Sequence, residues 1–120
     1  MKLNGKQLDL LNRRKLVVLA TSSLDGQPRA IIVEVNKAED DKIIITINEM
    51  ETTKDNLVNN KNVFLLASEE DYHYGLKISG KAEYYTQGKY FDFVNNLETN
   101  KSYSPKGAVV ITVKKVIEFK

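Results

Sequence analysis

The most informative segment of the sequence spans residues 48–63 and reads NEMETTKDNLVNNKNV. It follows a strand-like apolar run at residues 42–47 and leads into a second apolar run. Thr52 and Thr53 can cap a short helix between the two runs, because a hydroxyl accepts a hydrogen bond from a first-turn N–H group. The other free N–H groups and the helix dipole favour an anion, and Lys54 is next in sequence. The pattern predicts a helix start that binds a phosphate, although a plain cap with a solvated lysine explains the turn chemistry more simply.

Length and composition indicate one small domain covering residues 1–120. This length suffices for one hydrophobic core but not for two. The net charge of +2 is too small to argue for nucleic acid as a partner. No apolar run reaches the length of a membrane-spanning helix, and residues 1–5 lack the apolar core of a signal peptide. We therefore expect a cytoplasmic protein with no membrane partner.

Hydrophobic periodicity predicts six strands joined mostly by short turns. Residues 75–83 alternate apolar and polar side chains, which is typical of a strand with one buried face. Residues 15–21 are almost continuously apolar, so we expect both faces of that strand to be covered. Asp25 and Gly26 predict a hairpin turn, since glycine readily adopts a left-handed conformation. The expected strands are residues 15–21, 29–35, 42–48, 62–68, 75–83 and 107–119.

Three helices are expected around these strands. Asn4 and Gln7 have the spacing of a capping box, which predicts a first helix that ends near Arg14. A second, short helix is expected after the third strand, in the stretch quoted above. Thr86 is expected to cap a third helix before the last strand. One face of that helix is expected to carry Tyr90, Val94 and Leu97.

The order of these features resembles the flavin-binding split-barrel family, which includes pyridoxamine 5′-phosphate oxidase and small bacterial FMN-binding proteins. The family's turn after its third strand resembles the segment that carries Thr52, Thr53, Asn56 and Leu57. The family's first hairpin resembles residues 19–28. A later strand of the family resembles residues 75–83, with Gly80 at the position of the family's glycine, and the family's last strand resembles residues 107–113. The family's basic phosphate anchor usually lies three residues before the Asn56 position, where this chain has Thr53; the lysine is displaced to position 54.

The resemblance implies a mainly β fold, a six-stranded, Greek-key-like split β-barrel with three helices. It also implies a homodimer with FMN at the twofold interface. Such a protein acts in electron transfer or in flavin-dependent oxidoreduction of an unknown redox partner or small-molecule substrate. Whether the chain is an enzyme stays open, and true pyridoxamine 5′-phosphate oxidase activity is not expected, because those enzymes are longer. A deazaflavin is the alternative cofactor, since the wider superfamily also uses it.

Site residues follow from the resemblance by position. The second strand, residues 30–35, would run beside the isoalloxazine ring, and the end of the third strand would lie near the ring and ribityl chain. Ordinary core packing is the alternative for the apolar members, since side chains alternate along a strand. Five aromatic residues would serve the dimer interface or pack a helix on the barrel: Tyr84, Tyr85, Tyr90, Phe91 and Phe93. The expected cofactor-binding residues are Ile32, Val33, Glu34, Thr46, Ile47, Asn48, Thr52, Thr53, Lys54 and Asn56.

Side-chain chemistry in the sequence is sparse. Cysteine is absent and His73 is the single histidine, so the usual clusters of metal ligands cannot form. No Gly-x-Ser-x-Gly elbow is present either, so we expect neither a catalytic residue nor a metal. The protein is then a binding module, or its reactivity comes from a cofactor. The rival interpretation is a cofactor-free barrel that binds a protein or a single-stranded nucleic acid. It would use Tyr84, Tyr85 and Tyr90 with Lys77, Lys81 and Lys89.

Overall fold

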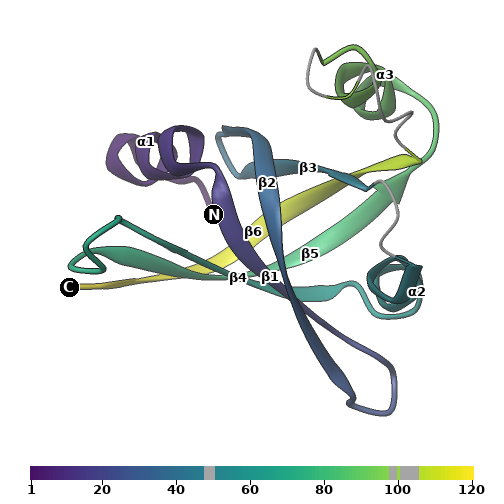
Figure 1. Ribbon diagram of the computed structural model, residues 1–120, viewed down its shortest axis with the longest axis horizontal. Coiled ribbons are helices and arrows are strands. Elements are labelled where there is room, and N and C mark those ends of the chain that lie inside the picture. The colour runs from purple at the N-terminus through teal and green to yellow at the C-terminus, as the bar shows by residue number, and fades with distance from the viewer. Residues whose placement is uncertain (48–50, 98–99, 101–105) are drawn as a thin grey trace.

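The computed structural model describes residues 1–47, 51–97, 100 and 106–120. Within these residues, six antiparallel strands close into a barrel in the order β1-β2-β3-β6-β5-β4 (Figure 1). This architecture confirms the six-stranded, mainly β barrel with three helices. The strands are β1 (Leu16–Ser22), β2 (Pro28–Glu39), β3 (Lys42–Ile47), β4 (Asn62–Ser68), β5 (Gly75–Tyr85) and β6 (Gly107–Phe119). The helices are α1 (Gly5–Arg14), α2 (Glu51–Asn59) and α3 (Lys89–Asn95).

Strand β1 closes the barrel because it pairs with β2 on one side and with β4 on the other. Closure leaves these strands without free edges and divides their side chains into an inner and an outer set. The inner set forms one continuous apolar core to which every strand contributes. One core residue from each strand in chain order is Leu19, Val33, Ile45, Leu65, Ile78 and Ile111.

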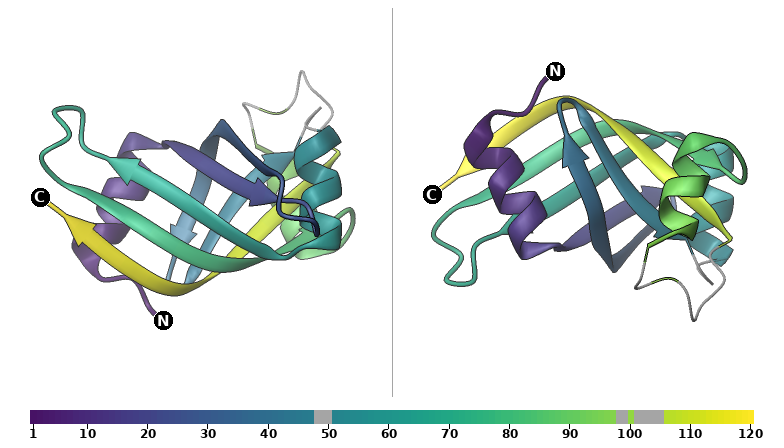
Figure 2. Two further views of the ribbon diagram at one scale, coloured as in Figure 1. Left: turned by 90° about the horizontal axis from the view of Figure 1, so that it is seen from below. Right: turned by 90° about the horizontal axis from the view of Figure 1, so that it is seen from above.

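Helix α1 covers one end of the barrel, and α2 lies at the opposite end (Figure 2). The predicted capping box is confirmed: Asn4 Oδ1 accepts from the Gln7 N–H and Gln7 Oε1 accepts from the Asn4 N–H, both at 2.9 Å. Leu10 and Leu11 are fully buried and join the barrel core. Among the helices that the structure describes, none has the length and apolarity to cross a membrane.

Helix α3 packs on the outside of β3 and β6. Val94 is buried there with Ile44, Ala108 and Val110, and partly buried aromatic side chains surround this second cluster. Tyr90, Val94 and Leu97 all belong to this cluster as predicted, but Leu97 lies beyond the end of the helix at Asn95. The expected cap at Thr86 is wrong, because the helix begins at Lys89 and no side chain bonds its start. Its N-cap is Gly88, whose φ of 91° suits a residue without a side chain. The aromatic residues that pack here are Tyr85, Tyr90, Phe91 and Phe93.

Strand β1 is buried on one face only, which corrects the expectation that both of its faces are covered. Val17 and Leu19 belong to the core and Thr21 is buried, whereas Leu16 is exposed and Val18 is only half-buried. The two apolar sets thus have different roles: one fills the barrel and the other leaves an apolar outer surface.

Gly80→Ala is expected to lower the free energy of unfolding by about 1–3 kcal/mol. Gly80 lies at the register shift between β5 and β6, where a Cβ would come within 2.6 Å of the Thr112 carbonyl oxygen. Gly5→Ala is the control, because a Cβ at the start of α1 meets nothing within 4 Å. Urea unfolding of both variants measures the difference, and equal stabilities would show that the close approach at Gly80 is not limiting.

Candidate functional site

An apolar surface covers the outside of β2, β1 and β4, and we call it the open face. Ile32, Val18 and Leu66 lie in register across the three strands. Ile32 is 71% exposed and Leu66 is 38% exposed, although both are large apolar side chains. Exposed apolar surface of this kind marks a place where a ligand or a partner binds. The next row of the open face consists of Ala30, Ala20 and Phe64.

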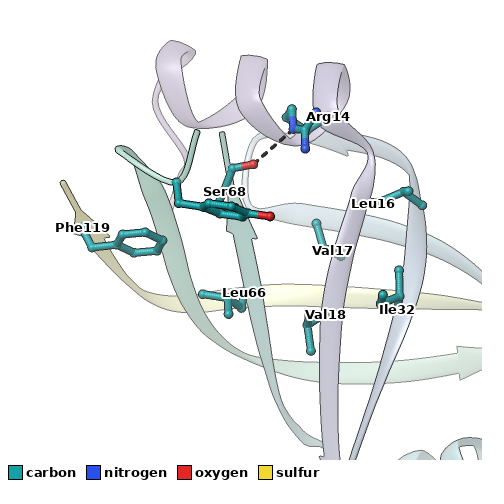
Figure 3. Close-up of a pocket in the computed structure, with 9 residues that line it drawn as sticks. Arg14, Leu16, Val17, Val18, Ile32, Leu66, Ser68 and Phe119 are labelled. Carbon is teal, nitrogen blue, oxygen red and sulfur yellow. Dashed lines mark hydrogen bonds between the residues drawn. The ribbon is translucent and has the colours of Figure 1, made fainter. Parts of the chain in front are cut away.

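A hollow of about 350 Å³ lies at the α1 end of the open face (Figure 3). Its walls are mainly apolar, and its one guanidinium belongs to Arg14, whose Nε donates to the Ser68 carbonyl oxygen at 3.2 Å. This volume falls in the range of small-molecule sites. The lining includes Leu16, Val18, Ile32, Leu66 and Phe119.

A second hollow, of about 320 Å³, lies further along β1 and reaches helix α2 through Thr21. Asn56 Nδ2 donates to Thr21 Oγ1 at 3.1 Å, and both residues are buried. This hydrogen bond fixes α2 against β1 beside the open face. The lining of this hollow includes Ala20, Ser22, Pro28, Asn62 and Phe64.

The first turn of α2 carries a buried hydroxyl without a partner. Thr53 is 1% exposed, and its Oγ1 makes no hydrogen bond within the part of the chain that the structure describes. The capping role expected for Thr52 and Thr53 is wrong, because α2 begins at Glu51 and both threonines lie inside it. An unpaired buried hydroxyl costs stability, so this atom is a candidate ligand contact.

Lys54 lies on a different side of α2 from Thr53. Its Nζ is 5.9 Å from the centre of the Tyr84 ring on β5, at the distance of a cation–π contact. Neighbouring helix positions face different directions, so the lysine and the buried hydroxyl do not share a surface.

The expected site residues on β2 and β3 fall into separate places. Ile32 lies on the open face, Glu34 is exposed, and Val33 is in the barrel core, where its side chain does not reach an external ligand. Thr46 Oγ1 donates to Asn36 at 2.6 Å and accepts from Asn100 at 2.9 Å.

Two expected site residues follow Thr46 in the chain. Ile47 pairs with Gly107 in the sheet, and Asn48 lies outside the described residues. The structure thus brings Asn56 together with Thr21 and places Thr53 three positions before Asn56 on the same face of α2. It sets Ile32 on the open face and leaves Thr46 on the side of the barrel that α3 covers. Sequence reasoning missed Thr21, Val18 and Leu66. The available signal was the continuous apolar run in each of β1 and β4, because a strand that buries one face in a barrel leaves its other apolar side chains outside.

Several titratable groups with shifted pKa values lie near the α1 end of the barrel. Burial raises the pKa of Tyr74 to about 12, and its hydrogen bond to Glu118 acts in the same direction. The hydrogen bond from Arg13 holds the pKa of the Glu69 carboxyl below its ordinary value. Among the described residues, no group of three or more His, Cys, Asp or Glu side chains could hold a metal ion. These shifts therefore mark ion pairing and a buried tyrosine away from Thr53.

The closed barrel, the open face and the buried end of α2 define a small antiparallel barrel with a candidate site on its outside. A family model described as "Pyridoxamine 5'-phosphate oxidase" matches residues 3–120. The chain therefore belongs to the pyridoxamine 5′-phosphate oxidase family, which confirms the resemblance seen in the sequence. A sequence search of curated proteins finds no match.

Solved structures share the fold over nearly the whole chain. HupZ of Group A Streptococcus superposes with a TM-score of 0.86 at 23% identity, over 97% of this chain and 93% of that chain. An FMN-binding protein from Syntrophomonas wolfei superposes with a TM-score of 0.80 at 19% identity, over 96% of this chain and 84% of that chain. A protein described as F420 reductase superposes with a TM-score of 0.74 at 17% identity, over 96% of this chain and 98% of that chain. At these identities the likeness shows the fold alone.

Thr21→Val is expected to lower the free energy of unfolding by about 1–3 kcal/mol, because the buried amide of Asn56 would lose its acceptor. Thr52→Val is the matched control, since the Thr52 side chain is exposed on α2, the helix that carries Asn56. Its effect should stay within about 0.5 kcal/mol. Chemical denaturation of both variants provides the comparison, and a Thr21 variant as stable as the wild type would mean that α2 does not depend on this bond.

Proposed function

We propose that this chain is a single FMN-binding domain, residues 1–120, that acts as a homodimer. Its role would be electron transfer or flavin-dependent oxidoreduction with an unidentified partner or substrate. The observation that carries the proposal is the exposed apolar open face, together with the unpaired hydroxyl of Thr53 on the helix at one end of the barrel. A flavin has an apolar ring and an anionic phosphate, so it needs both kinds of surface. Membership of the family and an FMN-binding structural neighbour support a flavin as the ligand class.

The outer face of β2 is the proposed place of the isoalloxazine ring. Ile32 offers exposed apolar surface, and Glu34 lies two residues further along the strand. Val33 would contribute only its backbone. A bound flavin supplies hydride or electron transfer, so no catalytic side chain is required. The chain's own residues would position the ring and exclude water from it.

The start of α2 is the proposed place of the phosphate. The first N–H groups of a helix have no partner within the helix, and the dipole adds partial positive charge. Nine residues form this helix, with Thr52 exposed and Thr53 buried in its first turn. The unpaired hydroxyl of Thr53 fits an acceptor oxygen supplied by a ligand. The residues present therefore fit a phosphate group at this end of the helix.

A second copy of the chain is the proposed cover of the open face. In the sheet register, Lys77 lies next to Leu66 at one edge of this face, and Glu34 lies next to Leu16 at the other edge. A twofold axis brings opposite edges of the same surface together. Glu34 of one protomer would then approach Lys77 of its partner, with the apolar rows buried between them. The flavin ring would be enclosed in the same interface.

A deazaflavin is the second candidate cofactor, because one structural neighbour is described as F420 reductase. The nucleic-acid alternative receives less support from the aromatic residues. Tyr84, Tyr85 and Tyr90 are only partly exposed and pack against the apolar clusters of the barrel, and the Tyr85 and Tyr90 rings lie 5.3 Å apart. Packed rings offer little face for stacking bases.

Purified protein is expected to retain or rebind FMN, because both proposed surfaces are present in one chain. Visible absorption before and after FMN addition and desalting measures this, and a parallel titration with a deazaflavin separates the two cofactors. Unfolded protein taken through the same desalting is the control for nonspecific retention. A folded protein that ignores both cofactors would contradict the proposed function.

Ile32→Asp is expected to convert the dimer into a monomer, because a charge would enter the apolar centre of the proposed interface. Leu24→Asp is the matched control, since Leu24 is 76% exposed at the hairpin tip, outside the open face. Light scattering after size exclusion measures the mass at equal concentrations. A monomeric wild type, or a dimeric Ile32→Asp variant, would argue against this interface.

A further inference from the structure

The hollow at the α1 end of the open face contains a cation with donors to spare. Arg14 is the last residue of α1, and its half-buried side chain lines the hollow. Its Nε donates to the Ser68 carbonyl oxygen at 3.2 Å, which holds the guanidinium against β4. A guanidinium has five N–H donors. Within the described part of the chain, the two terminal nitrogens of Arg14 make no hydrogen bond and no ion pair.

The neighbouring arginine is paired in a way that Arg14 is not. Arg13 donates to both carboxylate oxygens of Glu69, at 3.2 and 2.5 Å, and to Asp9 at 3.2 Å. The charge of Arg14 also favours the ionised form of Glu69, but both oxygens of that carboxylate are already bonded to Arg13. The terminal nitrogens of Arg14 are therefore available to an anion from outside the chain.

The remaining walls of the hollow restrict what that anion can be. They are mainly apolar and come from β1, β2, β4 and the end of β6 (Figure 3). A charge is stable against such walls only when it is paired, and one guanidinium pairs one negative charge. A carboxylate meets this condition better than a phosphate monoester, which carries about two negative charges at neutral pH. The apolar side chains around Arg14 are Leu16, Val17, Val18, Ile32, Leu66 and Phe119.

We propose that this hollow is a binding site for a small organic acid with one carboxylate on an apolar body. The carboxylate accepts hydrogen bonds from the terminal nitrogens of Arg14, and the apolar body lies against Leu66 and Ile32. The inference goes beyond the flavin function proposed above, because none of these contacts needs a flavin. Ile32 also belongs to the proposed place of the isoalloxazine ring, so the acid would lie beside a bound flavin.

Three probes with one phenyl ring separate the effect of charge from that of the apolar body. Phenylacetate carries one negative charge, phenylacetamide carries none, and phenyl phosphate carries about two. Calorimetric titration uses the full chain as purified, and its visible spectrum records any flavin that it retains. Phenylacetate is expected to bind about 10- to 100-fold more tightly than the amide, which is the effect of hydrogen bonds to a charged group. No binding of phenylacetate, equal binding of the amide, or tighter binding of phenyl phosphate would overturn the proposal.

Arg14→Gln separates a ligand contact from a purely structural role. Glutamine Nε2 is bonded to Cδ, as arginine Nε is, so the variant keeps a donor for the Ser68 carbonyl and loses only the terminal nitrogens and the charge. Its melting temperature is expected to stay within about 3 °C of the wild type. Its affinity for phenylacetate is expected to fall by about 10- to 100-fold, to that of the amide. Arg13→Gln is the matched control and should leave this affinity unchanged, because Arg13 is paired with Asp9 and Glu69.

An arginine that only attaches α1 to the barrel would give a different result. Arg14→Gln would then bind phenylacetate as the wild type does, and the proposal would be overturned. The Arg14 Nε–H signal in the NMR spectrum of the wild type is an independent measurement if the variant folds poorly. We expect this signal to shift on addition of phenylacetate and not on addition of the amide. A signal that neither probe shifts would contradict a site at Arg14.

Discussion

Strand β1 closes the barrel, and this closure determines where every other element can pack and where a ligand could bind. Because β1 pairs with both β2 and β4, their side chains lie either in the core or outside it. The inside is filled with apolar side chains, so a ligand must bind to the outer surface or at an end. Helix α3 covers the outside of β3 and β6, whereas the outside of β2, β1 and β4 keeps large apolar side chains exposed.

Helix α2 combines a buried docking contact with a buried hydroxyl that has no partner in the described part of the chain. Leu57 is 2% exposed in the core cluster and Asn56 bonds Thr21, so these two residues dock the helix. Thr53 lies three and four positions before them and shares their face of the helix. Docking by an apolar contact and one buried hydrogen bond lets the preceding turn keep an unpaired hydroxyl.

The sequence alone predicted the structure correctly where a feature depends on neighbouring residues. The capping box of Asn4 and Gln7, the left-handed Gly26 and the alternation of β5 depend on a few neighbouring residues, and the structure has all three. Prediction from the sequence failed where contacts between elements distant in the chain determine which side chains are buried or bonded. Whether β1 is covered on its outer face depends on what packs there, and the bond between Thr21 and Asn56 joins residues 35 positions apart. The docking of α2 against β1 sets this pair, and no short sequence motif encodes such a contact.

The same hydrogen bond also has a geometric consequence for the ligand. A molecule with an apolar ring and a charged end can satisfy both proposed surfaces only if their separation is fixed. That separation depends on how α2 sits against β1, and the contact between Asn56 and Thr21 holds the two elements together at the edge of a hollow of the open face. Thr21 is therefore important although it would not need to touch the ligand. In the proposed site, the buried polar pair would determine the distance between the two surfaces, and the exposed residues would determine which ligand fits between them.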